Sequence, residues 1–135
     1  MEGPVAFHAV IPDGEHPHLG LNQKIVFDRV LNNLGGGYHN QHGLFIAPTA
    51  GVYIFSTSIL SYTHNSDSLT VSILKNGATL GAAYAHGESL DQGSVSVVTQ
   101  LATGDEVWVG HRYGSTESIW GDYYSSFMGC LIMYV

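Results

Sequence analysis

Side chains that suit sugar binding are concentrated toward the C-terminal end of the chain. They are Arg112, Tyr113, Glu117, Trp120, Asp122, Tyr123 and Tyr124. Aromatic faces suit stacking against a sugar ring, and carboxylates suit hydrogen bonds from its hydroxyls. Arg112 is the cation that could meet the carboxylate of a sialic or uronic acid. The alternative is that Trp120 and the tyrosines only pack a long loop onto the rest of the fold, and the sequence leaves both interpretations open.

The eight histidines raise the question of a zinc site. Only His16 with His18, and His39 with His42, are close in sequence, and neither pair is joined by a cluster of Cys or carboxylate residues. We therefore expect scattered loop histidines rather than zinc ligands. Such histidines would still make binding sensitive to pH near ~6.5.

The sequence carries no catalytic motif, and we predict that the chain is not an enzyme. The strained Gly-x-Ser-x-Gly elbow of serine hydrolases is absent from it. The triplet Gly35-Gly36-Gly37 precedes no helical pattern, so it is not a phosphate-binding loop.

Charge and composition exclude two further classes of function. The 135-residue chain has a net charge of −7 and only four fixed cations, namely Lys24, Arg29, Lys75 and Arg112. Nucleic acid binding needs clustered Lys and Arg, which these scattered residues do not supply. No apolar run approaches the ~20 residues of a membrane-spanning helix. Residues 1–4 also lack the basic and apolar regions of a signal peptide.

Period-two alternation of apolar residues predicts an all-β protein. The predicted strands cover residues 5–11, 25–30, 44–47, 51–62, 69–74, 79–86, 95–101, 106–112 and 127–135. Asn76-Gly77 predicts a type I′ hairpin turn, because both of its central positions require positive φ. Residues 32–37 are rich in Asn and Gly and are predicted to form a loop. Eight to ten short strands separated by turns indicate a sandwich or jelly roll.

Two predicted strands, 51–60 and 127–135, are apolar on both faces. In the second strand Phe127 and Leu131 share one face with Met133, while Met128 and Cys130 share the other face with Ile132 and Tyr134. A two-layer sandwich needs only one apolar face per strand, so we expect a partner subunit to cover the other. Trp108 is expected either in the core or in such a subunit contact.

A spaced set of aromatics and glycines runs from Phe27 through Asn33, Tyr38 and Phe45 to the run Gly51-Val52-Tyr53-Ile54-Phe55. This set resembles the signature of the C1q domain. Four further segments resemble other strands of that family: Ala6-Phe7-His8-Ala9, Leu74-Lys75-Asn76-Gly77, Gly104-Asp105-Glu106-Val107-Trp108-Val109 and Ser126-Phe127-Met128-Gly129-Cys130-Leu131. Thr57 departs from the signature, which usually has Phe or Tyr there. The resemblance assigns residues 5–135 to one C1q domain and residues 1–4 to an N-terminal extension.

The resemblance implies a ten-stranded jelly roll, shared with tumour necrosis factor ligands, that assembles as a secreted homotrimer. The sheet that holds the first and last strands would then face the threefold axis. On this basis the predicted trimer interface contains Val52, Ile54, Met128, Cys130, Ile132 and Tyr134.

The resemblance also implies a calcium site. Several family members hold calcium near the trimer apex with an Asp-Gln pair, and Asp91-Gln92 occupies the matching loop together with Glu88. Calcium takes six to eight oxygen ligands, which three converging copies could supply. A second acidic ligand often lies about eight residues earlier, where this chain has Ala83 and Tyr84. The alternative is a solvated turn in which Asp91 caps local amides.

The sequence contains no collagen-like repeat, and in this respect it resembles the short, single-domain family members that are common in invertebrates. We therefore expect a soluble trimeric pattern-recognition protein of innate immunity that binds microbial surface glycans or other pathogen-associated molecules in a lectin-like manner. The alternatives are a cytokine-like or adipokine-like ligand for a host cell-surface receptor, and a purely structural oligomer.

Overall fold

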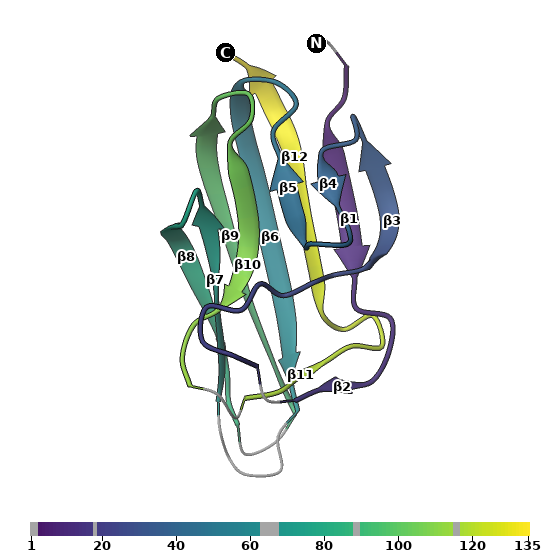
Figure 1. The fold of residues 1–135 in the computed structure, drawn as a ribbon, viewed down its shortest axis with the longest axis vertical. Helices are drawn as coiled ribbons and strands as arrows, with labels where there is room; N and C mark the ends of the chain where they lie inside the picture. Colours follow the sequence, from purple (N-terminus) through teal and green to yellow (C-terminus); the bar gives the residue numbers. More distant parts are fainter. Residues whose placement is uncertain (1–2, 18, 63–67, 88–89, 115–116) are drawn as a thin grey trace.

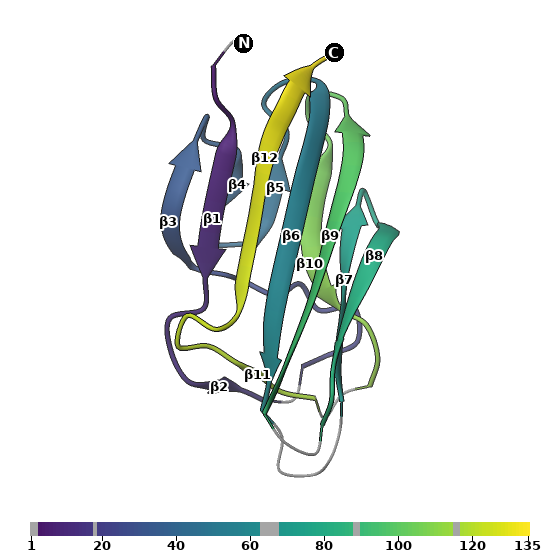
Figure 2. The ribbon, with the colours of Figure 1, turned by 180° about the vertical axis from the view of Figure 1, so that it is seen from behind.

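Two antiparallel β-sheets packed face to face form the fold (Figures 1 and 2). The computed structural model describes residues 3–17, 19–62, 68–87, 90–114 and 117–135. Within these ranges every regular element is a strand, so the all-β prediction is confirmed. No helix long and apolar enough to cross a lipid bilayer occurs in this part of the chain.

Sheet A is the larger sheet and contains both the first and the last strand. Its strands are β1 (Ala6–Val10), β2 (Glu15–His16), β3 (Arg29–Leu34), β6 (Gly51–Ser61), β9 (Asp91–Leu101), β11 (Ile119–Trp120) and β12 (Ser126–Tyr134). The central strand β6 pairs with β9 on one side and with β12 on the other, and β1 and β3 follow β12. The short strands β11 and β2 continue beside the far end of β6.

Sheet B consists of β4 (Tyr38–His39), β5 (Leu44–Ile46), β7 (Leu69–Lys75), β8 (Ala78–Ala85) and β10 (Glu106–His111), in the order β4-β5-β10-β7-β8. Both sheets together confirm the predicted jelly-roll sandwich. The described residues form twelve strands rather than the predicted ten. The extra strands include β2 and β11, which have only two residues each and are too short to show an alternating pattern in the sequence.

Aromatic rings fill the space between the two sheets. The ring of Phe7 stacks on Tyr38 at 4.7 Å between centroids and meets the edge of Phe127 at 4.9 Å. Phe45 packs against Phe55 at 5.4 Å, so sheet B and sheet A interlock through their rings. The buried aromatics of this cluster are Phe7, Phe27, Tyr38, Phe45, Tyr53, Phe55 and Phe127. The signature aromatics singled out in the sequence therefore lie in the core.

One predicted strand is displaced along the chain. Residues 25–28 are not in a strand, and β3 instead covers Arg29–Leu34, within a segment predicted to be partly a loop. The Asn33 side chain accounts for this difference, because it hydrogen-bonds to the backbone of Tyr38 and does not interrupt the strand. Its amide nitrogen donates to the carbonyl oxygen of Tyr38 at 3.0 Å, and its oxygen accepts from the Tyr38 backbone N–H at 3.2 Å. With those groups satisfied, β3 pairs with β1.

The hairpin between β7 and β8 forms as predicted. Asn76 and Gly77 have φ angles of 49° and 91°. These positive values match the type I′ turn expected from the Asn-Gly pair, which suits the twist of the flanking strands. On the other side of β7, pairing with β10 places Leu74 opposite Trp108 on the outer side of sheet B.

The outer side of sheet A carries a continuous apolar row. Strand pairing aligns Val98 with Ile54, Ile54 with Cys130, Cys130 with Ala6, and Ala6 with Leu34. These residues belong to β9, β6, β12, β1 and β3 in turn, so the row crosses five adjacent strands. Together with Val52, Met128 and Met133, which lie beside it in the same sheet, we call this row the apolar face of sheet A.

The predicted alternation of β12 is wrong beyond Leu131. A register shift between Leu131 and Met133 places Met133 opposite Val52, on the apolar face. Such a bulge leaves one extra residue in the strand and reverses the side on which the later side chains point. Ile132 lies at the bulge and is exposed. The Tyr134 hydroxyl hydrogen-bonds with the backbone N–H and carbonyl of Gly3, at 2.6 and 2.7 Å.

Burial of Tyr38 leads to a prediction about alkaline pH. Its hydroxyl donates to the carbonyl oxygen of Phe27 at 2.6 Å, and desolvation raises its pKa above the ordinary value. The unfolded phenol ionises near pH ~10, so the stabilisation is present below that pH and is lost as the pH rises above it. Replacing Tyr38 by Phe should lower the free energy of unfolding by about 1–2 kcal/mol at neutral pH, because the Phe27 carbonyl loses its donor.

Urea unfolding between pH 8 and pH 11 measures the effect. The Tyr38→Phe protein should lose less stability across this range than the parent, because it has one ionisable buried phenol fewer. Tyr53, whose pKa burial also raises, contributes equally to both proteins. The exposed Tyr124 provides the control, since Tyr124→Phe should change neither the stability nor its pH dependence. An unchanged alkaline slope in Tyr38→Phe would contradict the prediction.

Candidate functional site

The residues predicted to form one sugar-binding wall lie on two different sheets. Arg112 extends over the outer side of sheet B, where its Nη1 donates to the Ser72 hydroxyl of β7 at 2.8 Å. Tyr123 lies in the turn before β12, and its hydroxyl accepts from Nη1 of Arg29 in β3 at 3.0 Å. Strand β3 is at one edge of sheet A, away from β7 (Figure 1). The structure therefore separates Arg112 and Tyr113 from Asp122, Tyr123 and Tyr124.

Glu117 is buried and engaged inside the protein. Its Oε1 accepts from the backbone N–H of Thr70 at 3.0 Å and lies 2.9 Å from Nε2 of His111. The other ring nitrogen of His111 lies 2.8 Å from the carbonyl oxygen of Gly20. Both ring nitrogens thus face oxygens. These contacts tie together the segments that carry Gly20, Thr70 and Glu117.

Trp120 lies in β11, opposite Leu60 of β6, and its side chain packs within the fold. Its ring lies 4.6 Å from that of Tyr62, and its carbonyl oxygen accepts from the Ser125 hydroxyl at 2.6 Å. Tyr123 and Tyr124 are by contrast exposed. Asp122 and Tyr123 both have positive φ, so a tight turn presents these tyrosines to solvent.

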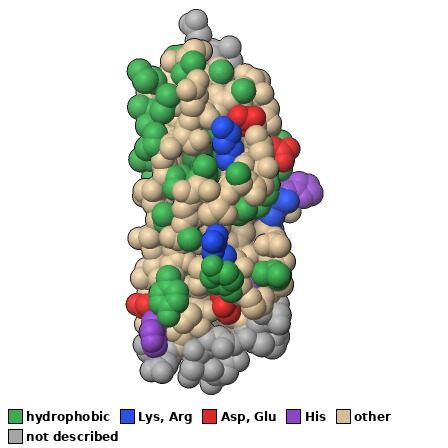
Figure 3. Space-filling view, turned by 90° about the vertical axis from the view of Figure 1, so that its left-hand side faces the viewer, with side chains coloured by type: hydrophobic (Ala, Val, Ile, Leu, Met, Phe, Trp, Pro, Cys, Tyr) green, Lys and Arg blue, Asp and Glu red, His purple; other side chains and the backbone are tan. Residues whose placement is uncertain are grey.

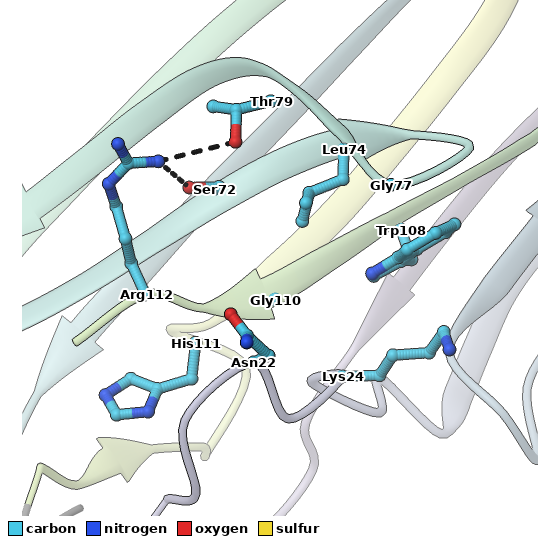
Figure 4. Close-up of a pocket in the computed structure, with 10 residues that line it drawn as sticks. All are labelled: Asn22, Lys24, Ser72, Leu74, Gly77, Thr79, Trp108, Gly110, His111 and Arg112. Atoms are coloured by element: carbon cyan, nitrogen blue, oxygen red, sulfur yellow. Dashed lines mark hydrogen bonds between the residues drawn. The ribbon is translucent and has the colours of Figure 1, made fainter. Parts of the chain in front are cut away.

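A groove of about 300 Å³ crosses the outer side of sheet B (Figure 4). Its walls come from β7, β8, β10 and the segment before β3. The lining residues are Asn22, Lys24, Ser72, Leu74, Gly77, Thr79, Trp108, Gly110, His111 and Arg112. Trp108 and Leu74 provide an apolar floor, while Lys24 and Arg112 extend from separate segments on either side of it (Figure 4). We refer to the whole depression as the groove.

Backbone hydrogen bonds hold Lys24 beside Trp108. His111 N–H donates to the Gln23 carbonyl at 2.8 Å, and Ile25 N–H donates to the Val109 carbonyl at 2.8 Å. These bonds make the segment around Lys24 an edge partner of β10, with Lys24 opposite Gly110. The Lys24 side chain then passes over the indole, with Nζ 4.7 Å from the centroid of the Trp108 ring. This geometry is a cation–π contact.

Arg112 is held at the other end of the groove. Its backbone N–H donates to the Thr70 carbonyl at 2.9 Å, directly after β10. The guanidinium donates through Nη1 to the hydroxyls of Ser72 and Thr79, and through Nε to the hydroxyl of Tyr113 at 3.0 Å. Among the described residues Nη2 has no hydrogen-bond partner, and in Figure 4 the unbonded nitrogen points away from Leu74 and Trp108.

The groove is locally cationic on an acidic protein. It contains Lys24 and Arg112, two of the four Lys and Arg residues of a chain with net charge −7. No Asp or Glu is among its described lining residues. On the side of the molecule that carries β7 and β8, Lys and Arg side chains lie beside hydrophobic ones (Figure 3). A ligand with both apolar faces and negative charge fits this environment.

The sequence reasoning did not identify Lys24, Ser72, Thr79 or Trp108 as site residues. Trp108 is half-buried on the outer side of sheet B and does not belong to the core, which was one of its two expected places. A signal for its orientation was present, because Val107 and Val109 alternate with it and point inward. Lys24 had no such signal, since its position depends on a pairing with β10 that is distant in sequence.

The predicted calcium loop is only partly described. Asp91 caps local structure, with Oδ2 accepting from the His86 backbone N–H at 2.7 Å. The Gln92 side-chain nitrogen donates to the Ser58 hydroxyl and to the Tyr124 carbonyl, at 2.9 and 2.7 Å. Glu88 lies outside the described residues. Within the described part of this loop, Asp91 and Gln92 alone do not supply the six to eight oxygens that calcium takes.

No group of three or more His, Cys, Asp or Glu side chains placed to hold a metal ion occurs within the described ranges. Of the paired histidines, His18 lies outside those ranges, and His16 contacts Asp13 with 3.7 Å between Nε2 and Oδ1. Cys130 is a free, half-buried thiol on the apolar face of sheet A.

The C1q domain family model matches residues 6–132, nearly the whole sandwich from β1 to β12. The chain belongs to the C1q domain family. The family resemblance noted in the sequence is thereby confirmed. C1q-domain proteins are typically extracellular and form trimers that bind ligands or receptors.

Solved structures share this C1q fold. The globular domain of zebrafish complement 1qA superposes with a TM-score of 0.79 at 19% identity, over 97% of this chain and 99% of that chain. Eiger TNF from S. frugiperda gives 0.80 at 12% identity, over 99% and 96% of the two chains. Murine APRIL at pH 5.0 gives 0.74 at 12% identity, over 96% and 100%. Identities this low show the shared fold.

The buried His111–Glu117 pair generates a stability prediction. Replacing Glu117 by Ala removes the oxygen that accepts from the Thr70 N–H and hydrogen-bonds with His111 Nε2, and should lower the free energy of unfolding by about 2–4 kcal/mol. Glu117→Gln keeps an oxygen at this position and should cost less. Glu15, in the short strand β2, serves as the control for loss of an acidic side chain. Urea unfolding at pH 7 makes the comparison, and equal losses for Glu117→Ala and Glu15→Ala would contradict the prediction.

Proposed function

We propose that this C1q-domain protein is a secreted, trimeric pattern-recognition protein of innate immunity that binds microbial surface glycans in a lectin-like manner, without enzymatic activity. The observation that carries this proposal is the groove, which combines an indole ring with hydroxyl groups and two cations. Sugar rings present a C–H face that stacks on aromatic side chains and a rim of hydroxyls that exchange hydrogen bonds.

The polar groups of the groove suit a saccharide. Asn22 offers a side-chain amide, and Ser72 and Thr79 offer hydroxyls on neighbouring strands β7 and β8. Trp108 supplies the stacking surface beside Leu74. A volume of about 300 Å³ is small for a ligand-binding site, so each groove would hold a short stretch of a glycan. Weak binding by single grooves would be strengthened by avidity when several grooves engage one surface.

The apolar face of sheet A supports assembly into trimers. Val98, Met128 and Met133 are exposed on it, with 62%, 45% and 58% of their surface accessible. An exposed row of this kind across five strands favours burial against other subunits. The groove lies on the outer side of sheet B, on the opposite side of the sandwich. Assembly through sheet A would therefore leave the three grooves exposed on the outside of the trimer.

Calcium is a further part of the proposal. Asp91 and Gln92 lie at the start of β9, paired with Ser61 and Leu60 of β6. In a trimer that packs through sheet A, three copies of this strand start would be repeated around the threefold axis and could together supply the oxygens that calcium takes.

A trimeric ligand for a host receptor is the second candidate. The observation that favours it is the exposed turn before β12, where Tyr123 and Tyr124 are 51% and 55% accessible and Arg29 contacts the Tyr123 hydroxyl. Tyr and Arg are enriched among the residues that dominate protein–protein interfaces. This function would place the recognition surface on sheet A's side of the molecule, away from the groove.

A glycan array tests the proposed function. The protein should bind a subset of microbial glycans, and Trp108→Leu should remove most of that signal because it removes the stacking ring. Trp120→Phe is the matched control, since Trp120 packs on Tyr62 outside the groove. Running the array with calcium and with chelator tests the calcium proposal, which predicts a stronger signal with calcium. Absence of binding to every glycan under both conditions would overturn the lectin function and favour the receptor ligand.

Sedimentation analysis tests the assembly. Three copies of the 14.5 kDa chain should sediment as a trimer. Met128→Glu should shift the protein toward monomers, because it introduces a charge into the apolar face without disturbing the core. Leu21→Glu is the control, since Leu21 is also exposed, at 62%, but lies outside that face. A monomeric parent protein, or a Met128→Glu trimer as stable as the parent, would contradict this prediction.

A further inference from the structure

Lys24 occupies the surface of Trp108 that a sugar ring would need. Its ammonium lies 4.7 Å from the centroid of the indole ring. From this contact we infer that the groove selects acidic saccharides, and that Lys24 leaves Trp108 to pair with the anionic group of the ligand when the sugar stacks. The inference rests on the proposed glycan-binding function and names the class of glycan that the groove takes.

The exchange discriminates against neutral sugars. A neutral ring that stacks on Trp108 must displace the ammonium from the aromatic face and provides no anion in return. A ring that carries a carboxylate or sulfate gives the displaced ammonium a stronger, charge-assisted partner. Lys24 has a flexible stem but a fixed backbone, so the ammonium can move while the segment stays paired with β10. The cation–π contact thus acts as a filter for charge.

Arg112 provides a second, more rigid anchor. Its guanidinium is already oriented by the hydroxyls of Ser72, Thr79 and Tyr113. Little side-chain entropy is then lost when the ligand binds, and Nη2 has no partner among the described residues. In Figure 4 Lys24 lies beside Trp108 and Arg112 lies at the other end of the groove, beyond Leu74, so a saccharide that extends from Trp108 past Leu74 meets a cation at each end.

The charge of the whole chain limits the size of the ligand. A net charge of −7 repels an extended polyanion wherever it passes beyond the groove. At physiological ionic strength this repulsion reaches about 8 Å from each charge, whereas the two cations act within the groove itself. Glu106, two residues before Trp108 on β10, and Asp105 beside it add negative charge near the hairpin end. The groove therefore suits a short acidic saccharide, or the acidic end of a glycan chain, better than a long polyanion.

Calorimetric titration of the full chain with a matched pair of probes tests the inference. Trigalacturonate carries three carboxylates, and its methyl ester has the same sugar rings without the charges. A sulfated galactose and unmodified galactose form a second pair, which distinguishes sulfate from carboxylate as the preferred anion. The variants are Lys24→Gln and Arg112→Gln, with Lys75→Gln as the control because Lys75 contacts the Gln100 carbonyl outside the groove.

The parent protein should bind the acidic member of at least one pair about tenfold more tightly than the neutral member. Lys24→Gln should lose most of this preference, with affinity for the neutral probe unchanged or higher because no ammonium has to be displaced. Arg112→Gln should weaken acidic binding by about tenfold and leave the neutral probe unaffected. Lys75→Gln should behave as the parent.

Tryptophan fluorescence gives a second readout that does not depend on affinity. In a Trp120→Phe background only Trp108 remains, and its emission should change on titration with the acidic probe and also, without ligand, on replacing Lys24 by Gln. Equal affinity of the parent for acidic and neutral probes would overturn the inference while leaving the lectin function standing. Unaltered selectivity in Lys24→Gln would likewise overturn it, and failure to bind any saccharide would overturn both.

Discussion

The aromatic cluster between the two sheets is the constraint on which the rest of the structure depends. Phe7 of β1 contacts Tyr38, Phe45 and Phe127, which come from three other strands. Large rings at a fixed spacing set the distance between the sheets and the register of the strands that carry them. Because these rings already fill the interior, other large side chains such as Trp108 must lie on an outer face. The packing of the core thereby determines which large side chains lie on the outer faces.

The two outer faces differ in chemistry, and this difference gives them different proposed uses. The apolar face of sheet A has a row of uncharged side chains from Val98 to Leu34, which suits a protein partner. The outer side of sheet B has Trp108 in one groove with Lys24 and Arg112, which suits a small polar ligand. Placing assembly and binding on opposite sides of one sandwich means that each surface can change without disturbing the other.

The groove depends on buried polar contacts beneath it. His111 lines the groove, but its ring is turned inward between the Gly20 carbonyl and Glu117. Glu117 in turn accepts from the Thr70 N–H of β7, and the Thr70 carbonyl accepts from Arg112. This chain of contacts connects the segment that carries Lys24 with the strand end that carries Arg112. The acidic residue expected to meet a ligand thus acts as internal support for the site.

The sequence by itself determined the fold class and most of the core. Period-two alternation reports which side of a strand is buried, and the signature aromatics Phe45, Tyr53 and Phe55 are in the core because each needs only its own strand to place it. Phe27 is also buried, although it lies outside any strand. The Asn76-Gly77 turn was likewise predictable, since its backbone conformation is local. The strand at Arg29–Leu34 was not predictable in this way, because it depends on the hydrogen bonds between the Asn33 side chain and the backbone of Tyr38.

Only the tertiary structure decided where the binding residues meet. Lys24 reaches Trp108 because its segment pairs with β10, and Arg112 is separated from Tyr123 because they extend from different sheets. The bulge that brings Met133 to the apolar face is also a property of strand pairing. Contacts between residues far apart in sequence depend on the register and packing of whole sheets, and no local pattern of residue types encodes them.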